Sequence, residues 1–200
     1  YDKDDQRLYD TWLQGPQVSP AGEVILEYVN KIPSLYLSDD FDGYRVGKYE
    51  IAVGARSALS NDFPYFRYTE VLMMKAECLL RLGQNEQEAA TIISQIRERA
   101  FRNTPEKANV TVEWLKGDTH IEYGILDEIG NITDQGDQTP VDVGGLYDEW
   151  SWAFASEAQR CTQMIRFGTF QHIRWFKQKP VGNHALLIPL HVHPLLDNPT

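Results

Sequence analysis

Glu149 and Glu157 have a spacing at which a pair of carboxyl groups for acid–base chemistry has to be considered. The two glutamates belong to one predicted helix, which places them on roughly the same face and about 12 Å apart along the axis. Retaining glycosidases use carboxyl groups about 5 Å apart, and inverting enzymes use about 6.5–9.5 Å. Because arginines lie close by in the sequence, we interpret both glutamates as partners in surface ion pairs and predict no catalytic pair.

The acidic segment at residues 38–43 has the composition of a calcium-binding loop. Its serine, two of its aspartates and its glycine take the first, third, fifth and sixth positions of an EF-hand loop. The match then ends, because Tyr49 stands where the loop needs a bidentate glutamate and no amphipathic helix flanks the segment. We therefore interpret residues 38–43 as a solvated acidic turn.

His191 and His193 have the spacing that puts two imidazoles on one side of a strand. No third ligand follows at the spacing of a zinc site, and Pro194 comes directly after the pair. The sequence also has no nucleophile elbow of the type G-x-S-x-G, no phosphate-binding loop and no glycine-rich dinucleotide turn. We therefore predict no metal, no other cofactor and no enzymatic activity.

Aromatic residues are frequent in the irregular first part of the chain, residues 1–62. A ring that stacks on the apolar face of a pyranose, beside polar groups that bind hydroxyls, is a typical sugar-binding arrangement. We hypothesise that Trp12, Tyr36 or Tyr44 provides such a ring. The alternative is that most of these rings simply pack against the helices.

The elements that would position such a site centre on a helical hairpin at residues 63–101. Its second half carries one apolar stripe at helical spacing, made of Ala89, Ile92, Ile93, Ile96 and Ala100. Gly83 ends the first predicted helix, and Asn85 with Glu88 has the pattern of a capping box that begins the second. The short turn requires antiparallel helices. The predicted fold class is therefore mainly α, with tetratricopeptide-like helical hairpins and long irregular loops.

Residues 116–148 are rich in glycine and aspartate, and we predict a long surface insertion there. Loops of this length in compact domains are typically functional or mobile. Together with Trp114, which comes just before it, the insertion is a second candidate region for ligand contact.

A further helix is predicted at residues 146–168, where one face is apolar. Glu157 and Arg160 have the spacing for an ion pair on the surface of this helix. Residues 185–200 contain a short apolar segment interrupted by prolines, which we predict to be an extended tail across the core.

Length and composition favour a single domain. The chain has 200 residues, of which 42% are hydrophobic, enough for one core. A net charge of −10 with scattered basic residues argues against nucleic acid as a partner. No apolar run is long enough to span a bilayer. Cys78 and Cys161 have apolar neighbours in predicted helices, so we expect both to be buried, with a disulfide or a reactive thiol as the alternatives.

Four landmarks along the chain carry a resemblance to a known family. They are RYTEVLMMKAE at residues 67–77 with RLG at 81–83 and IRERA at 96–100; GYR at 43–45 with KY at 48–49; the segment from Glu157 to IRFG at 165–168; and IP at 188–189 with NP at 198–199. In this order and spacing they resemble the C-terminal portion of a SusD/RagB-family protein. The chain departs from the family pattern at Ala158, where the family favours glycine, and at Gln163, where it favours aspartate.

The resemblance implies one C-terminal SusD/RagB-like region over residues 1–200. It also implies a lipoprotein at the cell surface of a bacterial outer membrane, held by a lipid anchor outside this chain. Such proteins capture a glycan or other nutrient without catalysis and deliver it to a SusC-like TonB-dependent transporter. None of the matching motifs is itself a ligand-binding motif, so no site residue is carried over.

Two other functions remain open from the sequence. One is a helical-repeat scaffold that binds protein, for which the predicted hairpin would serve equally well. The other is a member of the same family that binds peptides instead of glycans. The irregular aromatic region at residues 1–62 and the insertion at 116–148 favour glycan capture, because a pure helical-repeat array would have little use for them.

Overall fold

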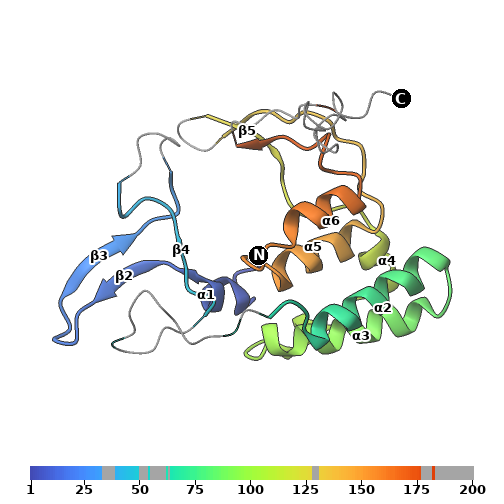
Figure 1. Cartoon of the computed structure of the whole chain (residues 1–200), viewed down its shortest axis with the longest axis horizontal. Coiled ribbons are helices and arrows are strands. Elements are labelled where there is room, and N and C mark those ends of the chain that lie inside the picture. The colour runs from blue at the N-terminus through green and yellow to red at the C-terminus, as the bar shows by residue number, and fades with distance from the viewer. Residues whose placement is uncertain are drawn as a thin grey trace, which may run out of the picture.

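The computed structural model describes residues 1–32, 39–49, 54, 62, 64–127, 131–176 and 182. Within them helices are the main regular elements, and the strands are short and form small sheets. The helices α2 to α6 gather on one side of the molecule, and a hairpin of β2 and β3 projects on the other (Figure 1). The predicted tail at residues 185–200, which includes the two histidines considered for zinc, lies outside the described residues.

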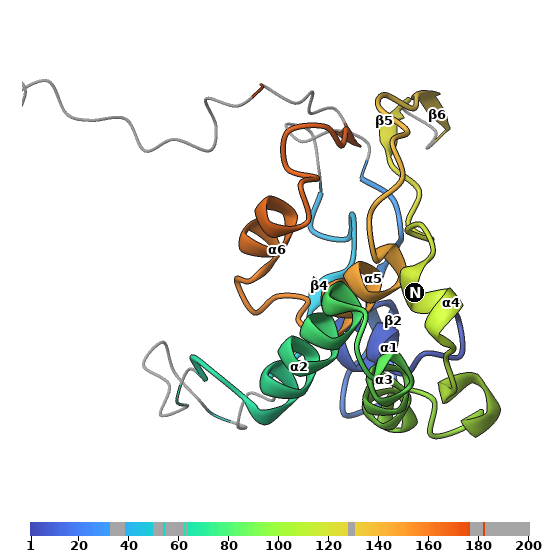
Figure 2. The same ribbon diagram turned by 90° about the vertical axis from the view of Figure 1, so that its right-hand side faces the viewer.

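The predicted helical hairpin at residues 63–101 is present. Its helices are α2 (Tyr68–Leu82) and α3 (Glu86–Ala100), which lie side by side in both views (Figures 1 and 2). Gly83 ends α2 with φ of 64°, a left-handed conformation that glycine adopts without steric cost. The next backbone N–H, that of Gln84, donates to the carbonyl of Leu79 at 3.0 Å.

The predicted capping box at the start of α3 is wrong. Asn85 has φ of 48° and its side chain makes no capping hydrogen bond. The carboxylate of Glu88 turns instead to Lys75 of α2, at 2.6 Å. A left-handed residue points its side chain away from the N–H groups of the first turn, so the sequence pattern of a capping box is present without its hydrogen bonds.

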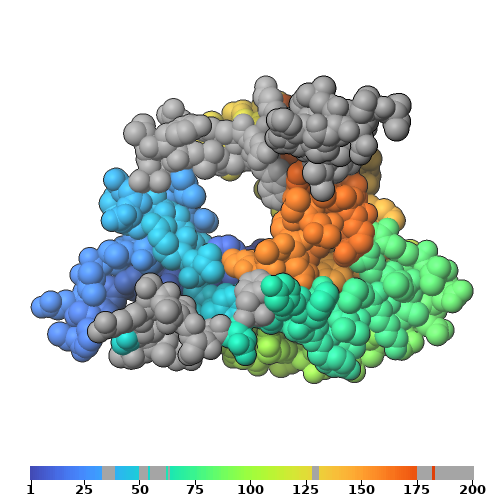
Figure 3. Space-filling view, in the orientation of Figure 1, coloured from blue at the N-terminus to red at the C-terminus, as the bar shows by residue number. Residues whose placement is uncertain are grey.

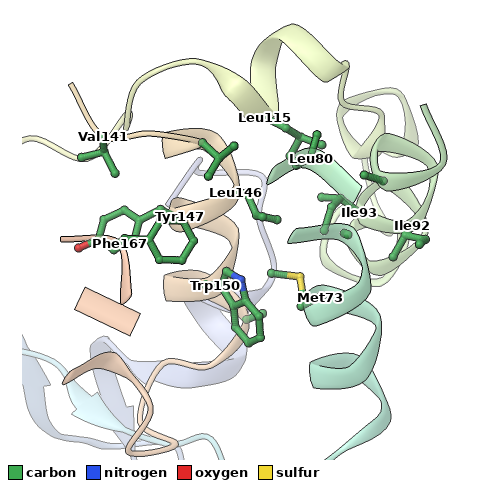
Figure 4. Close-up of a cluster of buried hydrophobic side chains, with 14 of the residues drawn as sticks. Met73, Leu80, Ile92, Ile93, Leu115, Val141, Leu146, Tyr147, Trp150 and Phe167 are labelled. Atoms are coloured by element: carbon green, nitrogen blue, oxygen red, sulfur yellow. The ribbon is translucent and has the colours of Figure 1, made fainter. Parts of the chain in front are cut away.

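The main core lies where α5 (Gly144–Ala153) crosses the hairpin. Leu146 and Trp150 of α5 lie among buried side chains that include Met73 of α2 and Ile93 of α3 (Figure 4). Trp150 is only 1% exposed, and its indole N–H donates to Glu77 Oε2 at 3.0 Å. One apolar cluster therefore joins three helices that are distant in sequence.

A small sheet forms from the insertion and the segment after the last helix. In it β5 (Gly124–Leu126) pairs antiparallel with β6 (Ile132–Asp134) and parallel with β7 (Trp175–Phe176). The prediction of a surface insertion at residues 116–148 is wrong for its last part. Val141 and the start of α5 are buried, and the two glycines at residues 144 and 145 let α5 begin directly against residues 114–119.

The predicted single helix at residues 146–168 is broken into α5 and α6 (Arg160–Arg166). Ser156 and Ala158 both have positive φ, of 63° and 59°, which an α-helix cannot contain. The predicted ion pair of Glu157 with Arg160 is also wrong. The turn carries Glu157 to Arg67, at 2.7 Å, so the carboxylate joins the turn to the segment before α2.

Both cysteines are exposed and free, which corrects the expectation that they are buried. Cys78 lies on a face of α2 that the described residues leave open, and Cys161 lies on the outer side of α6. An apolar neighbourhood in the sequence does not show which of two helix faces is covered.

Within residues 1–32 and 39–49 the helix and the strands are all short, which agrees with the prediction for this part of the chain. They are α1 (Arg7–Thr11), β1 (Trp12–Leu13), β2 (Gly15–Val18), β3 (Val24–Tyr28) and β4 (Arg45–Val46). β2 pairs with β3 and β1 pairs with β4, each antiparallel. In the space-filling view these residues contact the helical part near its base and stand apart from α6 (Figure 3). The backbone N–H of Asp39 donates to Asp42 Oδ2 at 2.8 Å, which closes an acidic turn.

Candidate functional site

Aromatic side chains from four parts of the chain line a hollow of about 540 Å³. We call it the ring-lined hollow. Its lining residues are Tyr1, Asp2, Asp5, Arg97, Phe101, Trp114, His120, Ile121, Glu122 and Trp152. They come from the N-terminal segment, α3, α4 (Val112–Lys116), the insertion and α5. The volume lies within the range of small-molecule sites in proteins, about 300–1,000 Å³.

Trp114 reaches the hollow because α4 begins and packs in a defined way. The hydroxyl of Thr111 accepts from the backbone N–H of Trp114 at 3.1 Å and so caps α4. Gly145 of α5 lies directly on this helix, since an added Cβ there would come within 2.2 Å of the Trp114 carbonyl oxygen. This close approach brings the rings of Trp114 and Trp152 to 6.5 Å between centroids.

His120 is held over Trp114 by a buried carboxylate. Asp148 of α5 is fully buried and accepts from the hydroxyl of Thr119 at 2.5 Å and from the backbone N–H of His120 at 2.6 Å. His120 Nδ1 lies 3.2 Å from the same carboxylate, and its ring stacks on Trp114 at 4.8 Å between centroids. Burial raises the pKa of Asp148, and the hydrogen bonds from Thr119 and His120 oppose that rise.

A buried ion network supports the floor of the hollow. The carboxylate of Glu149, which is 0% exposed, binds both Arg7, at 2.9 Å, and Arg97. The guanidinium of Arg7 also binds the carboxylate of Asp5, with 2.7 Å between Nη2 and Oδ2. Burial alone would raise the pKa of Glu149, but the charges and hydrogen bonds of the two arginines outweigh it and hold that pKa below its ordinary value. The expectation that Glu149 forms a surface ion pair is therefore wrong.

This network fixes the N-terminal segment as one wall of the hollow. The ring of Tyr1 lies 6.2 Å from that of Trp152, and its hydroxyl donates to the Trp152 carbonyl at 3.3 Å. Burial raises the pKa of the Tyr1 hydroxyl, and a hydrogen bond with Trp12 acts in the opposite direction. Asp2 pairs with Lys107 at 3.0 Å, and Glu122, which also lines the hollow, is exposed.

A second, more polar hollow lies next to the first. It has a volume of about 230 Å³ and shares His120, Ile121 and Glu122 with the ring-lined hollow. Its other lining residues include Thr119, Gln135, Asp137, Gln138 and Thr139. Segment 119–122 is thus a ridge between an aromatic hollow and a hollow rich in amide, hydroxyl and carboxylate groups. Such a pair suits a ligand with apolar faces and many hydroxyls.

The rings predicted from the sequence occupy other places. Trp12 is half-buried in β1 opposite Val46, and Tyr44 is half-buried just before β4. Neither lines the ring-lined hollow, although the hydrogen bond with Tyr1 places Trp12 close to its wall. Tyr36 lies outside the described residues. The second predicted region, Trp114 with the insertion, is brought into the hollow.

Sequence reasoning missed Trp152, Tyr1 and His120. For Trp152 a signal was present, because Trp150 belongs to the apolar face of the helix and a residue two positions later lies on the opposite side. A large ring off the buried face is a reason to look for a ligand or a partner. The positions of Tyr1 and His120 depend on contacts with residues more than 25 positions away, which no local pattern reveals.

The described part of the chain has no group of three histidine, cysteine, aspartate or glutamate side chains that could hold a metal ion. Within that same part, no helix is long and apolar enough to cross a membrane. Glu149 and Glu157 are both bound by basic side chains, the first by Arg7 and Arg97, the second by Arg67 and Lys48. The pKa of Glu157 also lies below its ordinary value, since the hydrogen bonds and charges of Arg67 and Lys48 outweigh its burial.

Comparison with known proteins gives one clear relationship. The model of the SusD family matches residues 1–185 of the chain. Nothing matches the chain among the curated proteins, and no solved structure matches it.

Proposed function

Because the chain belongs to the SusD family, we propose that it is a non-catalytic binding protein that captures a glycan nutrient at the bacterial cell surface. The observation that carries this proposal is the ring-lined hollow with its polar neighbour. Sugar rings have apolar faces that stack on aromatic side chains and edges that need hydrogen-bond partners. The two hollows offer both kinds of surface side by side.

The chemistry of the carboxylates supports binding without hydrolysis. A glycosidase needs one carboxylic acid with a raised pKa and a second carboxylate facing the substrate. Glu149 is fully buried under two arginines, its pKa is lowered, and it lines neither the ring-lined hollow nor its polar neighbour. Asp148 has a raised pKa, but it is also fully buried and its oxygens already accept hydrogen bonds from Thr119 and His120.

The same proposal includes delivery of the ligand to a SusC-like TonB-dependent transporter at the outer membrane, with a lipid anchor outside this chain. The hairpin of α2 and α3 provides a surface for such a partner. The outward face of α2 carries apolar side chains that remain exposed, among them Tyr68 at 75%, Val71 at 52% and Leu82 at 67%. A row of this kind is typical of a surface that contacts another protein. Whether α2 and α3 are part of a longer tetratricopeptide-like array is likewise a proposal.

The exposed face of α2 also favours a second candidate function, a scaffold or peptide-binding member of the family. In that case the hollow would be secondary, and affinity would depend on α2. Substituting Val71 and Leu82 with serine would then abolish binding of a peptide ligand, while a loss of the ring of Trp152 would have no effect.

The test is calorimetric titration of the protein against a panel of soluble polysaccharides and host-type glycans, with chromatography of each mixture for released products. Saturable binding without breakdown supports the proposal. Trp152→Ala is then expected to weaken binding of the best ligand by about tenfold or more, as for a central aromatic contact. Tyr44→Ala is the matched control, since this ring lies outside the hollow.

Three results would contradict the proposal. Products in the chromatogram would show an enzyme. If Tyr44→Ala reduced affinity while Trp152→Ala did not, the site would lie in the first part of the chain and not in the hollow. If no glycan bound while the protein still co-purified with a transporter, the protein-binding function would be the better one.

A further inference from the structure

A separate hollow of about 240 Å³ lies between the start of α2, the end of α3 and α1. Three arginines line it: Arg7, Arg67 and Arg99. The hydroxyl-bearing Thr69 and the amide-bearing Gln95 line it too, and its remaining wall consists of aliphatic side chains from α2, α3 and α5. We call it the arginine hollow.

The arginine hollow is distinct from the ring-lined hollow. Arg7 and Ala153 line the first, whereas their near neighbours Asp5 and Trp152 line the second. The buried network around Glu149 stands between them, so a ligand in one hollow does not contact the other. Nothing in the proposed glycan capture uses the arginine hollow.

Its cations are only partly matched by carboxylates. Arg67 binds Glu157 through two hydrogen bonds of 2.7 and 2.8 Å, but Lys48 binds the same carboxylate at 2.5 Å. Two cations therefore share one anion. Arg99 is exposed, and among the described residues its guanidinium has neither a hydrogen-bond nor an ion-pair partner.

The charges of Arg67 and Arg99 also act on Lys48, although burial has the larger effect on its pKa. Its pKa is lowered, first by burial and then by the charges of Arg67 and Arg99, even though Glu157 acts to raise it. This local excess of positive charge stands out in a chain with a net charge of −10. A partly desolvated cluster of like charges favours a bound counter-ion, because the ligand then removes repulsion that folding has left in place.

We propose that the arginine hollow binds the carboxylate of a small organic acid. Arg99 donates to it with its planar fork, Arg67 supplies the second positive charge, and Gln95 and Thr69 provide neutral donors at the rim. A guanidinium fork matches the two oxygens of a carboxylate. The aliphatic wall and the volume leave room for the carbon body of the acid, which a bare inorganic anion would not fill.

The test is calorimetric titration of the protein with galacturonate and with N-acetylglutamate, which carry the carboxylate on a sugar and on an amino acid. Galactose is the neutral counterpart, and inorganic sulfate is the anion without a carbon body. At least one of the two acids is expected to bind saturably, more weakly as sodium chloride is added, and galactose not at all. The acid that binds identifies the source of the carboxylate.

Variants of Arg99 separate a built site from general charge attraction. Arg99→Gln is expected to weaken binding about tenfold or more, as for the loss of a charged hydrogen-bond donor. Arg99→Lys keeps the charge but removes the fork and should recover only part of the affinity. Arg102→Gln is the control, because it removes the same charge from an exposed arginine that pairs with Asp10 outside the hollow.

Arg99 is exposed, so these variants are expected to fold, and thermal unfolding of each would verify this. Equal binding by wild type and Arg99→Gln would overturn the proposal. Equal losses in Arg99→Gln and Arg102→Gln would do the same, since they would reflect net charge alone. Binding of sulfate at least as tight as that of both acids would overturn the choice of a carboxylate, and failure of both acids to bind would remove the site.

Discussion

Glu149 is the buried carboxylate on which the first test of this structure depends. It is 0% exposed and accepts hydrogen bonds from two arginines that are themselves at least nine-tenths buried. Substituting Glu149 with glutamine keeps the shape and one acceptor oxygen but removes the only carboxylate that bridges α1, α3 and α5 among the described residues. Two guanidinium charges then remain in a poorly solvated place.

The magnitude follows from that geometry. Removing one partner of a buried ion pair costs about 3–5 kcal/mol of unfolding free energy, because the remaining charge stays buried without compensation. Arg7 keeps Asp5, so we expect Glu149→Gln to fall at the lower end, about 3 kcal/mol. For a chain of this size that loss lowers the melting temperature by roughly 6–12 °C.

The assay is urea unfolding followed by circular dichroism, at pH 7 and at steps down to pH 4. The folded-state pKa of Glu149 is lowered, so its contribution to stability is fully present above the unfolded pKa of about 4.3 and is lost as pH falls through the folded value. The difference between wild type and Glu149→Gln should therefore be constant near pH 7 and shrink as the solution is acidified below about pH 4.

Glu88→Gln is the matched control, since Glu88 makes a single ion pair with Lys75 and both side chains are about half exposed. This exposed pair should contribute about 0–1 kcal/mol. If Glu149→Gln cost no more than Glu88→Gln at pH 7, the buried network would not stabilise the junction of the three helices, and our account of the hollow's supporting wall would be refuted.

Two further substitutions test the backbone that positions the site. Ala158→Gly should stabilise the protein by about 0.5–1 kcal/mol, because Ala158 is exposed with φ of 59° and the strain relieved exceeds the entropy that glycine adds to the unfolded chain. The control is Ala155→Gly, which lies in the same turn without a positive φ and should destabilise the protein. Equal effects of the two substitutions would contradict the assigned turn. Gly145→Ala should cost about 2–3 kcal/mol, because its Cβ would meet the Trp114 carbonyl at 2.2 Å. Both are measured by urea unfolding, and a stable Gly145→Ala variant with unchanged glycan affinity would show that the close approach of α4 to α5 is unimportant.

The hairpin of α2 and α3 could be predicted because its signals are local. The apolar stripe from Ala89 to Ala100 and the terminating Gly83 each act within a few residues, and the structure agrees with both. The prediction of a capping box was wrong although its sequence pattern is also local. The side chains of Asn85 and Glu88 fit the pattern, but the left-handed backbone of Asn85 and the attraction of Lys75 decided the outcome.

The interruption at residues 154–159 could not be read from the periodic pattern. The apolar spacing continues through this segment, and alanine at position 158 gives no local warning of a positive φ. The interruption coincides with tertiary contacts, because Glu157 forms ion pairs with Arg67 and Lys48, which lie about 90 residues or more away along the chain. The same applies to Glu149, whose burial depends on two arginines that no spacing rule connects to it.

The candidate site was predictable only in part. The idea of aromatic stacking led to rings in the first part of the chain, because irregular segments rich in aromatics resemble binding surfaces. The rings that the fold brings together are Trp114 and Trp152, which belong to helices separated by the whole insertion. Their meeting depends on the absence of side chains at Gly144 and Gly145, a packing requirement that becomes visible only in three dimensions.

Asp148 holds the turn at Thr119 and His120 from inside the fold. Residues that would contact a ligand in this turn are therefore not the residues that keep the protein folded. The anchoring carboxylate belongs to α5 and is fully buried, while Ile121 and Glu122, which line both hollows, directly follow the anchored residues along the chain. The side chains of Ile121 and Glu122 can therefore vary in chemistry without removing this anchor. Laboratory libraries restricted to these two residues should therefore yield folded proteins, and differences in ligand preference among them would come from the surface of the ridge and not from the helices.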